Sequence, residues 1–292
     1  MTENSTVALS SAAITTEHRV IQALSDWIGG GQPAWLCTII KTWGASPRPA
    51  GSILAFHPEH GVVGSLSGGC IEEDLLRKLA DKSQSESPIQ SPFLYEYQIS
   101  GDDQVRYSLP CGGQLTILVE HIIPSEDNLA HLSTLVDGFR QRVRKVRQVS
   151  LKSGQMSLSA ASGVIEGNSA VQLTEELMRV SFGPAFKMLL MGAGEVSRCV
   201  ADIANTVDFS VTICEPRDSY LQGFGQEGVS VVQCMPDDLI REQFSDSYCA
   251  ILALAHDPRV DDMGLMEALR INAFYVGAVS YTHLTLPTKR IV

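Results

Sequence analysis

The sequence predicts an α/β protein with two domains, an α+β domain followed by a domain built on a doubly wound parallel sheet. Three observations support this prediction. The chain has 292 residues, which is enough for two domains of the common size of roughly 150 residues. Its first half contains short strand-like stretches joined by glycine-rich turns. Its second half alternates short apolar stretches with amphipathic ones, which is typical of β-α-β units.

The first domain is predicted over residues 17–123. Apolar residues at helical spacing precede a run of three glycines, which ends the first helix. Gly/Pro-rich and Gly-Gly segments separate the elements that follow. In order, we expect a helix over residues 17–28, strands over 34–40, 52–56 and 61–66, a helix over 70–82, and strands over 93–99 and 114–123.

Residues 124–185 are predicted to form a linker or intermediate region, with a helix over 129–147. Residues 148–180 are polar and weakly periodic, and they indicate small strands or a linker. The second domain is predicted over residues 186–278 as a Rossmann-like fold. Its expected elements are strands over 187–191 and 209–214 around a helix over 196–207, strands over 229–232 and 248–255, a helix over 263–270 and a strand over 274–277.

The composition excludes several classes of function. The net charge is -11, and the basic residues are scattered apart from one short cluster at residues 140–147, so nucleic acid is not an expected partner. Residues 1–16 do not have the pattern of a signal peptide, and no apolar run approaches the roughly 20 residues that span a bilayer. The seven cysteines form no C-x-x-C pair, which argues against a disulfide framework or structural zinc site. These features predict a cytoplasmic protein.

The segment Gly192-Ala193-Gly194 follows a predicted strand and begins a predicted helix, where a dinucleotide fingerprint belongs. Glu215 lies at the end of the next strand, where an acidic residue contacts a ribose in such folds. Serine at position 197 replaces the third glycine, so NAD(P) or another nucleotide and a purely structural turn both remain open. His256 ends another predicted strand. It could act as an acid/base group, as a ligand or as a cap of the following turn.

The first domain contains a loop of small residues around one arginine, from position 44 to position 52. The Arg48 guanidinium could hold a phosphate in a bidentate contact, and an ordinary turn with a solvated arginine is the alternative. Cys70 and Cys111 each adjoin a Gly-Gly pair, where the backbone could approach a ligand beside the sulfur. Either cysteine could instead be a small buried apolar residue.

These segments together resemble the XdhC/CoxI family over residues 20 to 278. The resemblance rests on first-domain motifs and on short second-domain motifs. The first-domain motifs are Gly44-Ala45-Ser46-Pro47-Arg48-Pro49-Ala50-Gly51-Ser52, Gly64-Ser65-Leu66-Ser67-Gly68-Gly69-Cys70-Ile71-Glu72 and Cys111-Gly112-Gly113. The second-domain motifs are Gly192-Ala193-Gly194, Glu215-Pro216-Arg217, His256-Asp257-Pro258 and Tyr275-Val276-Gly277-Ala278.

The resemblance implies an accessory factor that binds the molybdenum cofactor (molybdopterin) and protects it while sulfur is installed. The implied partners are a cysteine desulfurase and the apoenzyme of a xanthine dehydrogenase-like molybdenum hydroxylase, and a homodimer is compatible with this role. Cys70 and Cys111 are the expected contacts to molybdenum or its sulfur. The expected cofactor-binding residues are Ser46, Arg48, Gly51, Ser67, Gly68, Gly69, Cys70, Cys111, Gly112, Gly113, Gly192, Gly194, Glu215 and His256.

Two other functions are compatible with the same residues. An NAD(P)-dependent oxidoreductase would use the second domain, with Cys70 or His256 as its catalytic group. A scaffold that only tethers hydroxylase and desulfurase would bind no ligand.

The chain departs from the family pattern at three places. The family usually has histidine at the position of Glu195 and aspartate at the position of Glu215. After residue 278 the family pattern stops, so we expect residues 279–292 to be a non-native tail and the Rossmann-like domain to be truncated.

Overall fold

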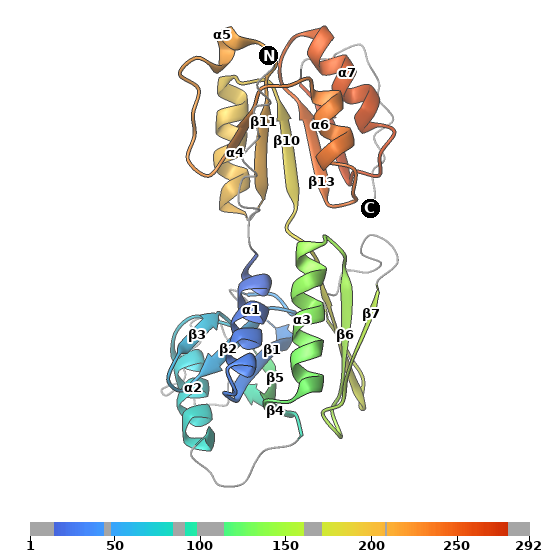
Figure 1. Cartoon of the computed structure of the whole chain (residues 1–292). Helices are drawn as coiled ribbons and strands as arrows, with labels where there is room; N and C mark the ends of the chain where they lie inside the picture. Colours follow the sequence, from blue (N-terminus) through green and yellow to red (C-terminus); the bar gives the residue numbers. More distant parts are fainter. Residues whose placement is uncertain are drawn as a thin grey trace. The chain divides into compact units, whose positions relative to one another are not determined.

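The computed structural model describes residues 15–43, 48–83, 91–97, 114–160, 171–207 and 209–279, with only the backbone of Cys70. The chain divides into two compact units between Pro184 and Ala185, and each is described by itself. The first unit contains antiparallel sheets and helices, and the second contains a parallel sheet with helices (Figure 1). The predicted α/β fold class is therefore confirmed.

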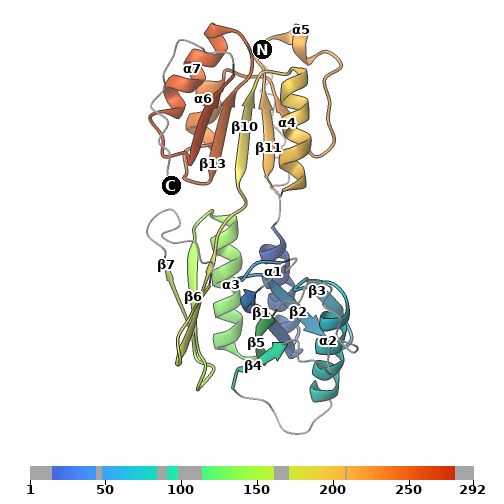
Figure 2. The same cartoon turned by 180° about the vertical axis from the view of Figure 1, so that it is seen from behind.

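The first unit is centred on a five-stranded antiparallel sheet with the order β3-β2-β1-β5-β4. Two helices pack on one face of this sheet and one helix on the other (Figure 2). The strands are β1 (Ala34–Trp43), β2 (Ile53–His57), β3 (Gly61–Gly64), β4 (Phe93–Tyr97) and β5 (Gln114–Ile122), and the helices are α1 (Thr16–Gly29), α2 (Cys70–Ser83) and α3 (Glu126–Arg140).

Alternation along β1 explains why both faces of this sheet are covered. Leu36 belongs to the core formed with α1 and α3, whereas its neighbours Trp35 and Cys37 belong to the core formed with α2. All three side chains are fully or almost fully buried. A strand that is apolar on both faces needs a layer on each side, since successive side chains point in opposite directions.

The predicted helix over residues 129–147 is wrong at its end. α3 stops at Arg140, and Arg142 adopts a left-handed φ of 58° in the turn that follows. The region from Lys145 onward forms a second antiparallel sheet, with the order β7-β6-β9-β8. Its strands are β6 (Lys145–Ser150), β7 (Met156–Ala160), β8 (Val171–Leu173) and β9 (Leu177–Phe182).

This second sheet packs into the core of the first unit through one face. Val149 and Met178 are fully buried there, against the residues of α1 and α3. Residues 124–185, expected as a linker or intermediate region, therefore contain α3 and a sheet that share a core with the preceding residues.

A buried ion pair connects the two sheets of the first unit. Arg147 on β6 donates two hydrogen bonds to the Glu120 carboxylate on β5, at 2.9 and 2.7 Å. Its Nε donates to Nε2 of His131 on α3, at 3.1 Å. Burial, together with the positive charge of Arg147, lowers the pKa of His131 to about 3, so this ring is neutral and accepts the hydrogen bond.

The second unit contains a five-stranded parallel sheet with the order β12-β11-β10-β13-β14. α4 packs on one face, and α6 and α7 pack on the other. The strands are β10 (Lys187–Met191), β11 (Ser210–Cys214), β12 (Ser230–Val232), β13 (Cys249–Ala253) and β14 (Tyr275–Ala278), and the helices are α4 (Glu195–Thr206), α5 (Asp218–Leu221), α6 (Pro236–Gln243) and α7 (Pro258–Ala268).

Three helices in this unit differ from the prediction, and one of them, the short α5, was not predicted. α7 begins at Pro258 rather than at residue 263, because Asp257 caps its first turn by accepting a hydrogen bond from the Arg259 N–H at 3.1 Å. α6 was not predicted, although Pro236 at its first turn is a common start signal. The strand order reverses direction between β10 and β13, which makes their carboxyl ends the expected ligand-binding edge.

None of the helices in the described ranges is both long enough and apolar enough to cross a membrane.

Candidate functional site

The turn after β10 requires glycine at position 192. Gly192 has a φ of +105°, and a Cβ atom there would lie 2.5 Å from the Ala255 Cα. Its N–H donates to the Cys214 carbonyl at 2.8 Å. The buried Ser197 hydroxyl donates to the Gly192 carbonyl at 2.5 Å, so this serine holds the turn against α4. The turn is therefore packed tightly between β11 and the segment after β13.

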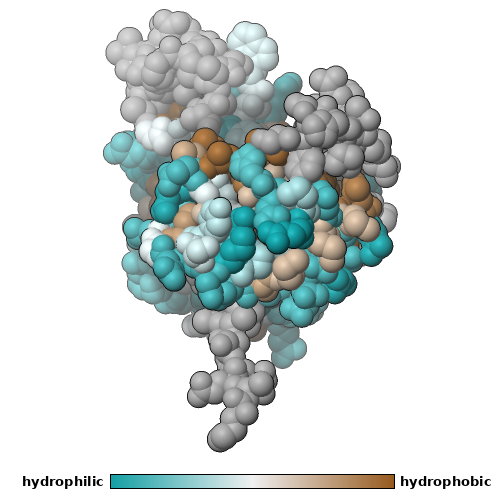
Figure 3. Space-filling model, turned by 90° about the horizontal axis from the view of Figure 1, so that it is seen from above, coloured by the Kyte–Doolittle hydropathy of each residue, from teal (hydrophilic) through white to brown (hydrophobic). Residues whose placement is uncertain are grey.

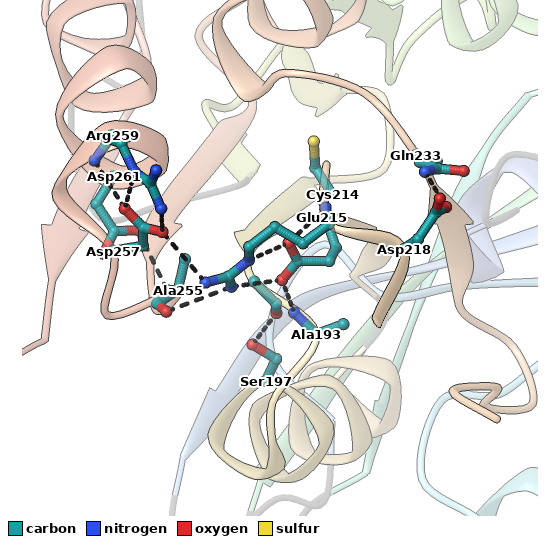
Figure 4. Close-up of polar contacts among 12 residues, drawn as sticks. Ala193, Ser197, Cys214, Glu215, Asp218, Gln233, Ala255, Asp257, Arg259 and Asp261 are labelled. Carbon is teal, nitrogen blue, oxygen red and sulfur yellow. Dashed lines mark hydrogen bonds and ion pairs between the residues drawn. The ribbon is translucent and has the colours of Figure 1, made fainter. Parts of the chain in front are cut away.

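Glu215 points back into this turn and is fully buried. Its Oε2 accepts from the Ala193 N–H at 3.1 Å (Figure 4). Arg217 donates to both carboxylate oxygens at 2.7 Å. Burial alone would raise the pKa of Glu215, but the hydrogen bonds from Arg217 and Ala193 outweigh it and hold the pKa below its usual value. The carboxylate is ionised and already bonded.

This geometry changes the expected role of Glu215. In a dinucleotide fold an acidic residue at this position bonds the ribose, and the glycine-turn amides face the pyrophosphate. Here the carboxylate accepts the hydrogen bond of the Ala193 amide and is held by Arg217 instead. The structure therefore provides no free carboxylate at position 215 for a ribose hydroxyl.

Gly194 and Glu195 leave the start of α4 open to solvent. Gly194 is the N-cap residue, and a Cβ atom there would meet none of the described atoms within 4 Å. The Glu195 side chain is 87% exposed, with Arg198 at 3.6 Å, so it points away from the turn. Seen toward the carboxyl edge of the sheet, the visible described surface is mostly hydrophilic with small apolar areas (Figure 3).

The segment after β13 brings acidic groups to the same edge. His256 is exposed and has a left-handed φ of 54°, which is uncommon for a residue other than glycine. Asp257 lies 3.5 Å from Arg217 and 2.9 Å from Arg259. The hydrogen bonds from Arg259, together with the charges of both arginines, lower the pKa of Asp257 to about 2. Within the described residues, His256 acts on the buried Asp261 through its backbone N–H and its charge, which assigns it no ligand role.

Asp261 lies beneath this segment and is fully buried. One oxygen accepts from the Ala255 N–H at 3.1 Å, and within the described residues the other has no hydrogen-bond partner. Burial raises the pKa of Asp261, although the backbone N–H groups of Ala255, Asp257 and His256 and the charge of His256 act in the opposite direction. Figure 4 shows Asp261 beside Ala255 and Asp257.

In the first unit, residues 65–68 form a loop, called the 65–68 loop below. This loop encloses one carboxylate oxygen of Glu72. Four donors converge on Glu72 Oε2. They are the Ser65 hydroxyl at 3.1 Å and the N–H groups of Leu66 at 2.9 Å, Ser67 at 3.2 Å and Gly68 at 3.2 Å.

The Glu72 carboxylate is a charged occupant of this loop. Burial would raise the pKa of Glu72, but the N–H groups and the Ser65 hydroxyl lower it overall. Gly68 and Gly69 have φ of +63° and +105°, and a Cβ atom at either would meet no atom of the described residues within 4 Å. The N–H groups of the loop thus converge on one anionic oxygen, an arrangement that is typical of anion-binding backbone segments.

The structure brings the predicted residues together in two groups. Gly192, Gly194, Glu215 and His256 lie at one edge of the parallel sheet. Ser67, Gly68 and Gly69 precede α2, whose first residue is Cys70.

The other predicted residues are only partly described. Gly51, with a φ of +96°, donates to the Ile39 carbonyl at 2.8 Å and forms a turn after the half-buried Arg48, which has partners of its own. Ser46, Cys111, Gly112 and Gly113 lie outside the described residues, as does the side chain of Cys70.

Sequence reasoning missed three residues that shape these sites. Glu72 has the appearance of an ordinary first-turn residue, Arg217 received no role, and Asp261 was not considered. The spacing of Glu215 and Arg217 across one proline is the signal that could have found their pair, since residues two apart at a strand end can face one another. No comparable signal exists for Asp261, whose burial depends on the packing of α7.

The fold and these two glycine-rich sites define a two-domain α/β protein with a Rossmann unit. Residues 27–90 match the XdhC and CoxI family, and residues 188–284 match the XdhC Rossmann domain. The chain therefore belongs to the XdhC and CoxI family, which confirms the resemblance inferred from its motifs.

Two relatives extend this comparison over most of the chain. The chain is 21% identical over 290 residues to a protein of Bacillus subtilis (strain 168) described as a probable subunit of xanthine dehydrogenase, covering 92% of this chain and 84% of the relative. It also resembles the crystal structure of a xanthine dehydrogenase from Bacillus halodurans, with a TM-score of 0.64 and 23% identity over 89% of this chain and 81% of that chain. The second likeness shows the fold alone.

Proposed function

We propose that this protein is a chaperone of the molybdenum cofactor, which it binds, protects during sulfuration and delivers to a xanthine dehydrogenase-like molybdenum hydroxylase. Family membership supports an accessory role linked to xanthine dehydrogenase. The Bacillus subtilis relative, described as a probable part of that enzyme, supports the same association. The observation that carries the proposal is the convergence of four donors on Glu72 in the 65–68 loop.

The 65–68 loop fits the phosphate of a pterin cofactor. Backbone N–H groups that converge on one oxygen bind anions well, and a phosphate offers more acceptor oxygens and more negative charge than a carboxylate. The open outer side of Gly68 and Gly69 would let such a group approach the backbone. We propose that Glu72 fills the loop in the ligand-free protein and leaves it when the cofactor binds.

The other residues of this unit would complete the site. Ser67, Gly68 and Gly69 would hold the phosphate, and Arg48 would add a bidentate contact from the loop that also contains Ser46 and Gly51. Cys70 begins α2 directly after Gly69, and Cys111 with Gly112 and Gly113 would form a second thiol-bearing turn. When bound, the cofactor would supply a metal that accepts sulfur, and a thiolate is a soft ligand suited to that neighbourhood.

The second unit is proposed to assist rather than to transfer hydride. In an NAD(P)-dependent oxidoreductase, Glu215 would face a ribose, yet it is bonded to Ala193 and Arg217. Asp257 adds another carboxylate to the same edge. Its negative charge would repel a pyrophosphate and weaken the binding of that group. Gly192, Gly194 and His256 remain candidate contacts for a cofactor or nucleotide only if the bonds of Glu215 to Ala193 and Arg217 open.

The remaining parts of the proposal follow from the family. The partners are the hydroxylase apoenzyme and a cysteine desulfurase, and the chain acts in the cytoplasm as a maturation factor rather than an enzyme. A homodimer is compatible with this role. We also propose that residues 279–292 are not native; residues 280–292 lie outside the described residues, and the family match reaches residue 284.

Replacing Glu72 with glutamine tests whether the 65–68 loop is the binding site. Glutamine keeps the size of the side chain but removes the charge that competes for the donors, so we expect the affinity for molybdenum cofactor to rise about tenfold. The measurement is anaerobic titration of the purified chain with cofactor released from a molybdenum enzyme. Binding is monitored through the quenching of protein fluorescence.

Glu73→Gln is the matched control, because Glu73 is the exposed neighbour on the same helix turn. It removes the same charge from the chain without touching the loop, so its affinity should equal that of the wild type. An unchanged or weaker affinity of the Glu72→Gln variant, with a melting temperature lower than that of the Glu73→Gln variant, would show that Glu72 only ties the loop to α2. That result would remove the loop from the proposed site.

A further inference from the structure

Two cysteines meet at the carboxyl edge of the parallel sheet. Cys214 is the last residue of β11, and Cys234 follows β12 by two residues. The strands run parallel with Cys214 opposite Val232, so Cys234 leaves the sheet at the same edge. The two sulfur atoms are 3.5 Å apart, and the Cys214 thiol donates to the Cys234 carbonyl at 3.0 Å.

We propose that Cys214 and Cys234 form a thiol–disulfide exchange site whose oxidant is the disulfide of a small thiol, such as glutathione disulfide. The sulfur atoms of a disulfide lie about 2.0 Å apart, so these two need to approach by only about 1.5 Å. The flanking segments allow that movement to be local. Cys234 lies between the end of β12 and the start of α6, outside both elements.

The two thiols differ in a way that assigns their roles. Cys214 is fully buried, whereas Cys234 is partly exposed. The hydrogen bond between the two sulfur atoms lowers the pKa of Cys234, and the same contact together with burial raises the pKa of Cys214. Cys234 is therefore the accessible thiolate that attacks first, and Cys214 is the resolving thiol.

Each step of the exchange conserves atoms and electrons. The Cys234 thiolate attacks one sulfur of the small disulfide, whose S–S bond breaks and releases one thiolate, which takes up a proton from water. The Cys214 thiol then loses its proton and attacks the Cys234 sulfur, which expels the second small thiol. The protein dithiol has lost two electrons and two protons, and the small disulfide has been reduced to two thiols.

The simplest alternative is that the two sulfurs only fill space. Both cysteines border an apolar core that includes Leu239, and a thiol packs there as a small apolar group. Cys249 is a buried thiol of that kind in the same core, with its sulfur 3.3 Å from the Asp246 carboxylate rather than beside another sulfur. It serves as the internal comparison for reactivity.

The test uses the full chain with Cys199→Ser, because trypsin would otherwise leave the exposed Cys199 on the same peptide as Cys214. The reduced protein is incubated with glutathione disulfide, alkylated under denaturing conditions and digested. We expect residues 199–217 to be joined to residues 218–241 in a pair that dithiothreitol separates. Cys249 should remain fully alkylated.

Two variants in that background assign the order of attack. Cys214→Ser should trap glutathione on Cys234, and Cys234→Ser should slow the modification of Cys214 at least about tenfold, because that thiol is buried. Alkylation of both cysteines in the parent without any joined peptides would overturn the proposal. So would stable glutathione on Cys234 in the parent, since it would show that Cys214 does not resolve the mixed disulfide.

Discussion

Replacing Arg147 with alanine is expected to lower the free energy of unfolding of the first unit by about 3 to 5 kcal/mol. The guanidinium is fully buried and bonds both oxygens of the Glu120 carboxylate. Its removal leaves Glu120, which is only 3% exposed, as a buried charge without its partner. Urea unfolding followed by far-UV circular dichroism measures the change.

Two controls separate the lost ion pair from a general effect of losing an arginine. Arg140→Ala removes an exposed arginine that bonds Gln22, and it should change the free energy of unfolding by less than about 1 kcal/mol. The double variant Glu120→Leu with Arg147→Met should be more stable than Arg147→Ala, because no buried charge is left. Equal losses in Arg147→Ala and Arg140→Ala would contradict the structural role of the pair.

Replacing Gly192 with alanine is expected to destabilise the second unit by about 3 kcal/mol or more. The new Cβ would lie 2.5 Å from one backbone atom of Ala255 and 2.8 Å from another, and the φ of +105° is itself strained for alanine. The turn would have to move away from β13, which would also disturb the Ala193 hydrogen bond to Glu215. Differential scanning calorimetry should show a lower melting temperature for this unit.

Gly194→Ala is the matched control for the same turn. Gly194 has no strained φ, and a Cβ there would meet nothing within 4 Å in the part of the chain that the structure describes, so its replacement should cost less than about 1 kcal/mol. A similar loss of stability at both positions would mean that the close approach to Ala255 does not determine the need for glycine at position 192.

The parallel-sheet unit could be predicted from the sequence because several local signals agree there. An apolar strand, a Gly-Ala-Gly turn and an amphipathic helix follow one another over residues 187–207. The structure has β10, the Gly192 turn and α4 in this order. The end of α3 could not be predicted in this way, since Val143, Val146 and Val149 recur every three residues and imitate a helical face.

The contacts within the candidate sites depended on tertiary packing. The position of Glu215 at a strand end predicts a ribose contact, but Arg217 captures its carboxylate. The three acidic residues near the start of α2 look like ordinary helix-start residues, and only the path of the 65–68 loop shows that Glu72 is different. The pairing of Glu120 with Arg147 joins strands of different sheets, and no local pattern in one sequence reveals such a partner.

The most direct test of the proposed function is anaerobic purification of the wild-type chain from cells that synthesise the molybdenum cofactor. Molybdenum would be measured by elemental analysis, and the pterin by fluorescence after oxidative release. We predict that molybdenum and pterin remain bound in near-equal amounts and that NAD(P)H does not bind saturably. A chain that carries no pterin but binds NAD(P)H saturably would contradict the chaperone function and favour the oxidoreductase.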